Sequence, residues 1–153
     1  MLFDTNVIID VLQNREPWSL DGIMLFHAVA DRRIIGCITA KQIADIHYIS
    51  KKQFGETDNA DAKCRSIITG LLSLFELLDT LAADCQNAIV YENNDYEDAI
   101  MIATAARCRV DCIVTRDGRH FKSAPQDILT PGEMLERLGD CLSGRKDTTA
   151  RLT

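Results

Sequence analysis

The chain is short of several features that would each assign it to a class of protein. Its 153 residues contain no run of 18 or more apolar residues, so no membrane-spanning helix is expected. The opening segment, MLFDTNVIID, places Asp4 and Asp10 where a secretory signal has its basic and apolar regions. We therefore expect a protein that is not exported, has no membrane partner and is located in the cytoplasm.

Cysteine pairs with metal-binding spacing are also missing. None of the six cysteines forms a C-x-x-C pair, and no cysteine and histidine residues are spaced as zinc ligands. Most of the cysteines lie within apolar periodic segments, which is typical of small buried hydrophobic side chains in a reducing compartment. They are Cys37, Cys64, Cys85, Cys108, Cys112 and Cys141.

Basic residues are outnumbered by acidic ones, 17 to 23, which gives a net charge of −6. This balance argues against a protein that holds nucleic acid by charge alone. It does not exclude a site in which divalent ions neutralise carboxylates, because a bound ion is often the largest local charge. Several basic residues gather around a single acid, Asp117, in the segment RDGRHFK at 116–122.

Short apolar runs alternate with amphipathic segments along the chain. Strands are expected at 1–4, 34–38, 112–115 and 128–129, and helices at 5–14, 18–31, 40–53, 60–74, 81–90, 95–107 and 131–138. The FELL segment at 75–78 fits either a strand or the end of the preceding helix. This alternation predicts an α/β fold, a three-layer α/β/α sandwich with a mostly parallel central sheet. We expect one domain over residues 1–138 and a polar C-terminal tail over 139–153.

Acidic residues follow the predicted strands. Asp4 comes directly after the first strand, and Asp117 lies two residues beyond the 112–115 strand, so both belong to one edge of the sheet. Asp98 lies in the first turn of a helix that leads into that strand, and Asp45 lies about two turns into the helix after the 34–38 strand. Three or four carboxylates that converge on one pocket suit Mg²⁺ or Mn²⁺.

Each acid also has an ordinary structural interpretation. Asp4 can cap the first helix, although Thr5 or Asn6 can do so instead. Asp95 can accept hydrogen bonds from backbone amides at the start of its helix, and Asp117 can be a turn residue. Asp45 can be a solvated helix residue paired with Lys41, which lies four residues before it on the same helix face.

Four segments, in order, resemble the motifs of the PIN-domain family, the ribonuclease fold of VapC-type toxins. They are DTNVIIDVL at 4–12, TAKQIADIHYI at 39–49, DYEDAIMIATA at 95–105 and VTRDGRHF at 114–121. The resemblance extends from residue 1 to about residue 138. It implies hydrolysis of phosphodiester bonds in RNA with one or two Mg²⁺ or Mn²⁺ ions. It also implies an antitoxin protein as a partner and a homodimer.

The resemblance assigns roles residue by residue. The catalytic acids fall on Asp4, Asp45, Asp98 and Asp117, and three of them, Asp4, Asp98 and Asp117, hold metal. Asp45 stands where relatives often have Glu, so its side chain is one methylene shorter. Asn6 and Thr115 match supporting polar positions. From their position beside Asp117, the guanidinium groups of Arg116 and Arg119 are predicted to bind substrate phosphates.

Two other interpretations fit the residues less well, and a third stays open. A phosphatase of the haloacid dehalogenase kind needs a second acid two residues after the first, and that position is Asn6. A response-regulator receiver needs an acidic pair after its first strand and a lysine near its last. A PIN fold with weak catalysis, acting as an RNA- or protein-binding module, stays open, since all four acids are present but the net charge is acidic.

Overall fold

A single parallel sheet forms the centre of the fold, with strand order β3-β2-β1-β4-β5. The computed structural model describes residues 1–91 and 95–149, and within them every strand pairing is parallel. The strands are β1 (Leu2–Phe3), β2 (Cys37–Thr39), β3 (Glu76–Leu78), β4 (Cys112–Val114) and β5 (Asp127–Leu129). The predicted α/β class with a mostly parallel sheet is confirmed.

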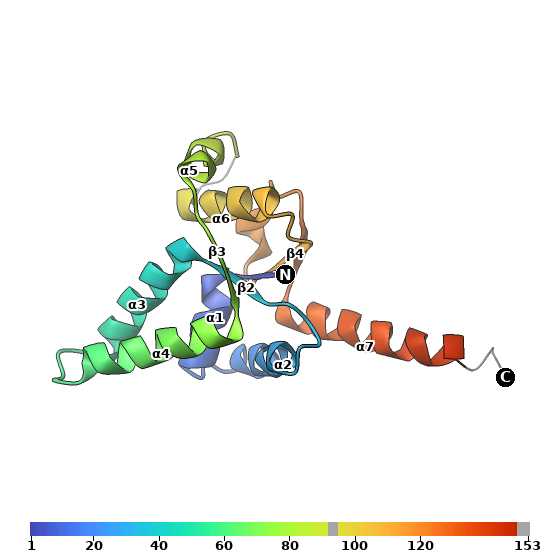
Figure 1. Cartoon of the computed structure of the whole chain (residues 1–153), viewed down its shortest axis with the longest axis horizontal. Helices are drawn as coiled ribbons and strands as arrows, with labels where there is room; N and C mark the ends of the chain where they lie inside the picture. Colours follow the sequence, from blue (N-terminus) through green and yellow to red (C-terminus); the bar gives the residue numbers. More distant parts are fainter. Residues whose placement is uncertain (92–94, 150–153) are drawn as a thin grey trace.

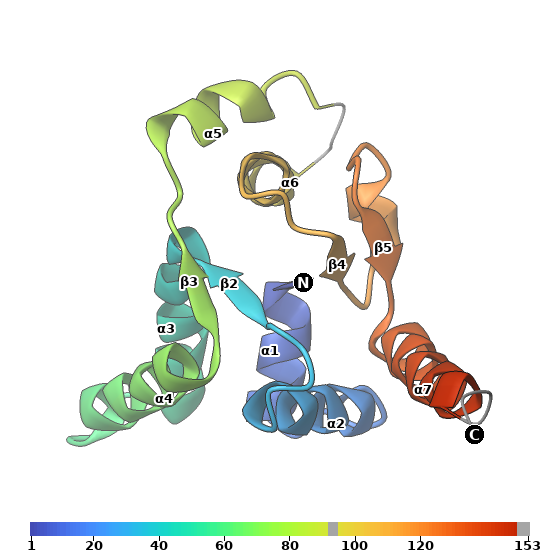
Figure 2. The ribbon, with the colours of Figure 1, turned by 45° about the vertical axis from the view of Figure 1, so that its right-hand side comes forward.

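Helices cover both faces of this sheet, which makes three layers (Figures 1 and 2). Side chains alternate along each strand, so Leu2, Cys37 and Ile113 pack on one face against α6 and the short 3₁₀ helix η1. The opposite face packs mainly against the other helices. The helices are α1 (Thr5–Leu12), α2 (Ser19–Ala30), α3 (Ala40–Phe54), α4 (Ala60–Leu74), α5 (Ala82–Ala88), α6 (Tyr96–Arg107), η1 (Gly118–Phe121) and α7 (Pro131–Thr149).

The order of the strands determines where a site can form. The chain builds outward from β1 through β2 to β3, then returns to the other side of β1 with β4 and β5. The direction of winding therefore reverses between β1 and β4. In open parallel sheets, ligands bind beyond the carboxyl ends of the strands at such a switch point. Asp4 and Thr115 are the residues that directly follow β1 and β4.

Some element boundaries differ from those predicted. The 34–38 strand begins only at Cys37, because Ile35 is exposed and the buried run starts later. The ambiguous FELL segment is a strand, β3, paired in parallel with β2. The last helix does not end near Leu138 but continues to Thr149, since Gly139 adopts helical backbone, which costs stability without ending a helix.

The start signal predicted in NNDYED at 93–98 falls partly outside the described residues, which resume at Asp95. The described cysteines form no disulfide, and Cys37, Cys64 and Cys112 are buried, as expected for small apolar side chains. No helix in the described part of the chain is long and apolar enough to cross a membrane.

Candidate active site

Asp4 is placed at the N-terminus of α1 but does not act as a cap. Its backbone N–H donates to the Val114 carbonyl at 2.9 Å, which continues the β1–β4 pairing. Its side chain makes no capping hydrogen bond, and Thr5 and Asn6, expected as caps, lie inside the helix. The carboxylate, 6% exposed, instead accepts a hydrogen bond from the Thr115 hydroxyl at 2.6 Å.

Thr115 connects the loop after β4 to the start of α1. Its hydroxyl donates to Asp4, and it accepts from the Asn6 amide nitrogen at 3.2 Å and the Asp117 backbone N–H at 3.0 Å. One donor and two acceptor positions are all that a hydroxyl has, and each is used. Asn6 also accepts the Arg116 backbone N–H at 3.2 Å. These bonds fix the carboxylate of Asp4 relative to the 115–117 loop.

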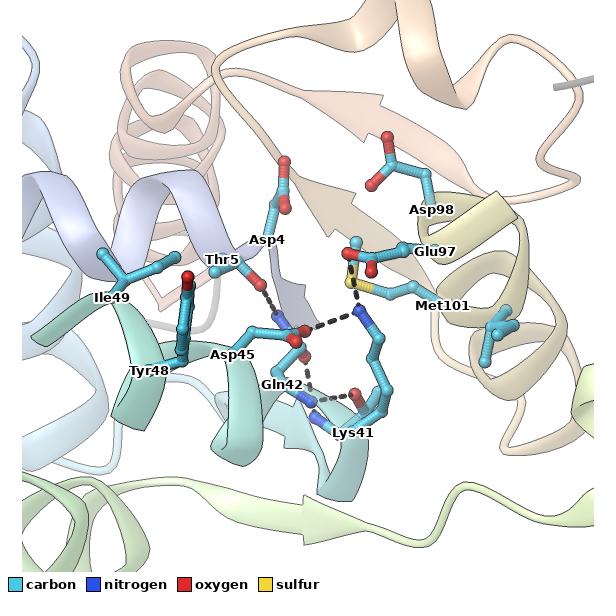
Figure 3. A pocket seen from close by; sticks show the side chains of 12 residues that line it. Asp4, Thr5, Lys41, Gln42, Asp45, Tyr48, Ile49, Glu97, Asp98 and Met101 are labelled. Carbon is cyan, nitrogen blue, oxygen red and sulfur yellow. Dashed lines mark hydrogen bonds and ion pairs between the residues drawn. The ribbon is translucent and has the colours of Figure 1, made fainter. Parts of the chain in front are cut away.

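Asp98 approaches the same pocket from α6. The predicted role of Asp95 at the start of that helix is confirmed, because its carboxylate accepts from the backbone N–H of Glu97 at 2.9 Å and of Asp98 at 3.4 Å. With the helix start satisfied by Asp95, the Asp98 side chain points across the pocket towards Asp4 (Figure 3).

The two carboxylates repel each other in a partly buried setting. The pKa of Asp4 is raised to about 6, chiefly by burial and also by the negative charge of Asp98, against the lowering effect of the Thr115 hydrogen bond. Burial also raises the pKa of Asp98, as does the neighbouring charge of Asp95, against the opposing effect of His120. Both acids therefore ionise less readily than usual, and a cation between them would relieve this strain.

Asp117 lies on the same rim but is held by a cation of its own chain. Its two carboxylate oxygens accept from Arg119 Nε at 2.8 Å and Nη2 at 2.7 Å. This pairing lowers the pKa of Asp117 well below its usual range. His120 lies between the two acids, with Nδ1 2.9 Å from Asp98 Oδ2 and Nε2 3.8 Å from Asp117 Oδ2.

Asp45 lies on α3 at the opposite side of the pocket, where Lys41 neutralises it. The predicted ion pair between them is confirmed, with a distance of 2.6 Å between Lys41 Nζ and Asp45 Oδ2. The same ammonium group lies 2.8 Å from Glu97 Oε2 on α6, so it links the two walls of the pocket (Figure 3). Glu97 was missed by the sequence reasoning, because nothing in the sequence shows that its helix faces α3.

Gln42 was also missed, although it supports the floor of the site. Thr39 caps α3 as predicted, and Gln42 completes the capping box by accepting the Thr39 backbone N–H at 2.8 Å. The Gln42 amide nitrogen donates to the Phe3 carbonyl at 2.8 Å and to the Thr5 hydroxyl at 3.2 Å. A Gln three residues after a Thr cap is a sequence signal that predicts the capping box. The contact of Gln42 with β1 has no such signal in the sequence.

Two adjoining pockets bring the acids together. One, of about 350 Å³, is lined by Asp4, Asp45 and Asp98, and the other, of about 400 Å³, by Asp4, Asp98 and Asp117. Asp4 and Asp98 belong to both, so they lie at the junction. The four acids singled out in the sequence therefore border one depression at the carboxyl edge of the sheet.

The donor set suits a hard divalent cation. Asp4 and Asp98 supply carboxylate oxygens, the ligands that Mg²⁺ prefers, and burial raises the pKa of both. Within the described residues, one set of three potential ligand side chains lies within 4.8 Å of one another, and it comprises Asp95, Asp98 and His120. It shares only Asp98 with the predicted ligands, and its imidazole is a ligand that suits zinc, iron or nickel ions better than Mg²⁺.

Both arginines predicted to bind substrate form ion pairs with acidic side chains of the same chain. Arg119 is paired with Asp117, as described above. Arg116 Nη1 lies 3.0 Å from Asp10 Oδ2, and its guanidinium carbon lies 4.7 Å from the centre of the Trp18 ring. Arg116 nevertheless lines the pocket that contains Asp117.

These features define an α/β domain whose acidic pocket lies at the switch point of a parallel sheet. A sequence profile described as "PIN domain" matches residues 1–119, and the chain belongs to the PIN-domain family. The resemblance seen in the sequence is therefore confirmed. None of the curated proteins compared with the chain matches it significantly in sequence.

Solved structures with the same fold come from toxin–antitoxin complexes. A toxin–antitoxin complex from Klebsiella pneumoniae has a chain that is 22% identical, with a TM-score of 0.61 and coverage of 85% of this chain and 96% of that one. A chain of VapBC2 from Rickettsia felis, bound to a DNA fragment from its promoter, is 16% identical, with a TM-score of 0.61 and coverage of 84% of this chain and 95% of that one. A chain of DNA-bound VapBC from Salmonella typhimurium is 18% identical, with a TM-score of 0.62 and coverage of 85% of this chain and 96% of that one. At these identities the likeness establishes the fold alone.

Proposed function

We propose that this protein is a metal-dependent ribonuclease that hydrolyses phosphodiester bonds in RNA. The observation that carries the proposal is the pair of facing carboxylates, Asp4 and Asp98, at the switch point of the sheet. Burial raises the pKa of both, and the charge of Asp98 adds to the effect on Asp4. Two like charges in one partly buried pocket favour a divalent cation as their counter-charge.

In this proposal Asp4 and Asp98 hold Mg²⁺ or Mn²⁺, with Asp117 completing the set. When bound, such an ion stabilises charge that develops on phosphate oxygens and lowers the pKa of an attacking water. Thr115 and Asn6 keep the Asp4 carboxylate in place through the hydrogen bonds described above. Asp45 lies in the same pocket, where it can orient a water molecule or accept its proton.

Arg119 has the position expected for a residue that meets a substrate phosphate. Its side chain is largely exposed at the rim and is held by Asp117 in a two-pronged pair. A phosphate that displaces this carboxylate would gain a bidentate contact and would release Asp117 towards the pocket. In this way, binding of the substrate phosphate would also free Asp117 to complete the set of metal ligands.

We further propose that the protein is the toxin of a toxin–antitoxin pair and forms a homodimer. The support is the shared fold with chains of toxin–antitoxin complexes, some of which are bound to DNA. A chain with a net charge of −6 is poorly suited to contact DNA itself. A separate antitoxin with basic residues would supply that contact and would complement the acidic pocket.

The test is cleavage of a labelled single-stranded RNA by the purified protein. Activity should require Mn²⁺ or Mg²⁺, should disappear with a chelator, and should fall at least about 100-fold in Asp4→Asn and Asp98→Asn. Asp61→Asn, which changes an exposed acid on α4, serves as the matched control and should retain activity. Equal activity in all variants, or none in the parent protein, would overturn the proposal.

A binding module with weak catalysis is the second candidate, and one observation favours it. Lys41 and Arg119 already neutralise two of the four acids, Asp45 and Asp117. Such a protein would bind RNA or a protein partner without metal and without cleaving it. The same assay separates the two candidates, because only a nuclease gives products that depend on both the metal and Asp98.

A further inference from the structure

We propose that Trp18 and Arg116 form a nucleotide subsite beside the acidic pocket, in which the Trp18 ring stacks on a base and Arg116 contacts the adjoining phosphate. The inference rests on the proposed function for its substrate class, single-stranded RNA. It concerns Asp10 on α1, Trp18 just before α2 and Arg116 in the loop after β4, in a pocket next to the one that holds the acids.

The position of Arg116 connects the two regions. It lines the pocket that contains Asp4, Asp98 and Asp117, and it also lines a separate pocket of about 270 Å³ that contains Trp18. Arg116 therefore lies between the two pockets. An RNA strand whose scissile phosphate lies at the acids would pass over this guanidinium group before reaching Trp18.

The side chain of Arg116 is held in a defined orientation. Its Nη1 donates to Asp10 Oδ1 at 3.1 Å and lies 3.0 Å from Oδ2. Asp10 is only 1% exposed, and Arg15 lies 3.7 Å away as its second cation. Among the described residues, the side-chain bonds of Arg116 are made by Nη1, so Nε and Nη2 are available to donate to a phosphate. Asp10 is therefore a positioning residue for this subsite.

Trp18 offers an aromatic face at the surface. It is 51% exposed, and the guanidinium carbon of Arg116 lies 4.7 Å from its ring centre. Proteins bind single-stranded nucleic acids with aromatic rings that stack on bases and with cationic side chains that contact phosphates, and a half-exposed tryptophan beside an arginine offers both groups.

The charges around the subsite indicate which part of the nucleotide each of the two residues contacts. Asp21 lines the Trp18 pocket together with Asp10, so a phosphate is disfavoured at that end. A base is neutral, and its N–H groups can donate to a carboxylate such as Asp21. The base therefore lies over Trp18, and the phosphate lies on the side of Arg116 that faces the acidic pocket.

Trp18 is the only tryptophan of the chain, so its fluorescence reports on the subsite directly. The parent protein is titrated with a short single-stranded RNA oligonucleotide in the presence of EDTA, which prevents cleavage. The expected result is saturable quenching of the fluorescence. Absence of quenching while a labelled RNA still binds, measured by anisotropy, overturns the proposal. Quenching by a protein partner but not by RNA also overturns it.

Variants then separate stacking from charge. Trp18→Ala should weaken RNA binding about 10-fold or more, whereas Trp18→Phe, which keeps an aromatic face, should stay within about 3-fold of the parent. Arg116→Lys keeps a charge beside Asp10 but loses the flat guanidinium group, and should weaken binding to an intermediate extent. Arg65→Gln, at an exposed arginine on α4, is the control and should bind normally. Unchanged binding in Trp18→Ala contradicts the subsite.

Kinetics distinguish failure of this inference from failure of the nuclease function. If the function and the subsite both hold, Trp18→Ala raises KM and leaves kcat close to that of the parent. Cleavage by the parent with an unchanged KM in Trp18→Ala overturns the subsite alone. Trp18-dependent binding by a protein that never cleaves RNA overturns the function and supports the subsite.

Discussion

The hydroxyl of Thr115 donates to the carboxylate of Asp4 at 2.6 Å, across 111 positions of the sequence. This bond joins the carboxyl ends of the neighbouring strands β1 and β4. It also explains why Asp4 stands at the start of a helix without capping it, since its oxygen is directed to Thr115. The acid is thereby aimed into the pocket that Asp98 faces from α6.

Removal of this hydroxyl is expected to cost stability as well as metal binding. Thr115→Val keeps the shape but leaves the Asn6 amide and the Asp117 backbone N–H without their acceptor. We predict a loss of about 1–3 kcal/mol in the free energy of unfolding, measured with urea. Thr115→Ser retains the hydroxyl and should lose much less. Equal losses in the two variants would contradict the role of the hydrogen bond.

Asp4→Asn is expected to stabilise the metal-free protein at neutral pH. The folded pKa of Asp4, about 6, lies above its ordinary value of 3.8, so the folded state binds the proton more tightly. Ionisation of Asp4 therefore costs stability as the pH rises from 3.8 towards 6, and the full cost, about 2–3 kcal/mol, applies above that range.

Thermal unfolding of the two proteins in EDTA between pH 4 and 8 measures this effect. The advantage of Asp4→Asn should be small near pH 4 and should grow until about pH 7. Added Mn²⁺ should then raise the Tm of the parent and not of the variant. A variant that is less stable than the parent at pH 7 in EDTA would show that Asp4 is not strained.

The Asp84–Arg107 pair, in which the acid is fully buried and the arginine is partly exposed, should matter more to stability than an exposed pair of the same type. Asp84, fully buried, accepts from Arg107 Nε and Nη2, both at 2.8 Å, and from Thr104 at 3.2 Å. Asp84→Ala removes the acceptor of Arg107 Nε and of the Thr104 hydroxyl, and we predict a loss of about 2–4 kcal/mol in the free energy of unfolding. Asp61→Ala, which breaks the exposed Asp61–Arg65 pair, should show no measurable change.

The Asp84–Arg107 pair also makes the stability of the protein depend on pH in the acid range. Arg107 lowers the pKa of Asp84 below its ordinary value of 3.8. The stabilisation from Asp84 is therefore complete above that value and is lost as the pH falls through the lower folded pKa. Urea unfolding between pH 2 and 5 should show the parent converging on Asp84→Ala at the acid end. A constant difference between them over this range would contradict the assignment.

Lys41 is expected to weaken metal binding by neutralising part of the pocket. Its ammonium group lies 2.6 Å from Asp45 and 2.8 Å from Glu97. Lys41→Gln removes that charge and leaves both carboxylates facing the pocket, so the affinity for Mn²⁺ should increase several-fold. Calorimetric titration of the parent and the variant measures the change. A lower affinity in the variant would show that Lys41 organises the site instead of competing with the metal.

Much of the site could be predicted from local patterns. Asp4 and Asp117 follow strands, and parallel strands bring their carboxyl ends to one edge, so the meeting of these residues follows from the fold class. The caps at Thr39 and Asp95 have local sequence signals and were predicted for the same reason.

Contacts between distant elements could not be predicted in this way. The link from Lys41 to Glu97 depends on how α3 and α6 are spaced across the sheet, and the stacking of Arg116 on Trp18 depends on the path of the chain between α1 and α2. No periodicity encodes either distance. The continuation of α7 beyond Leu138 was missed because Gly139 resembles a stop signal while adopting helical backbone.

The central claim is that Asp4 and Asp98 together hold a catalytic divalent cation. Its most direct test is anomalous diffraction from a crystal of the protein soaked in Mn²⁺, recorded at the manganese absorption edge. The account predicts an anomalous peak at the junction of the two acidic pockets, in contact with the carboxylates of Asp4 and Asp98. A peak held only by other residues, or no peak at saturating Mn²⁺ with the two side chains turned apart, would contradict it.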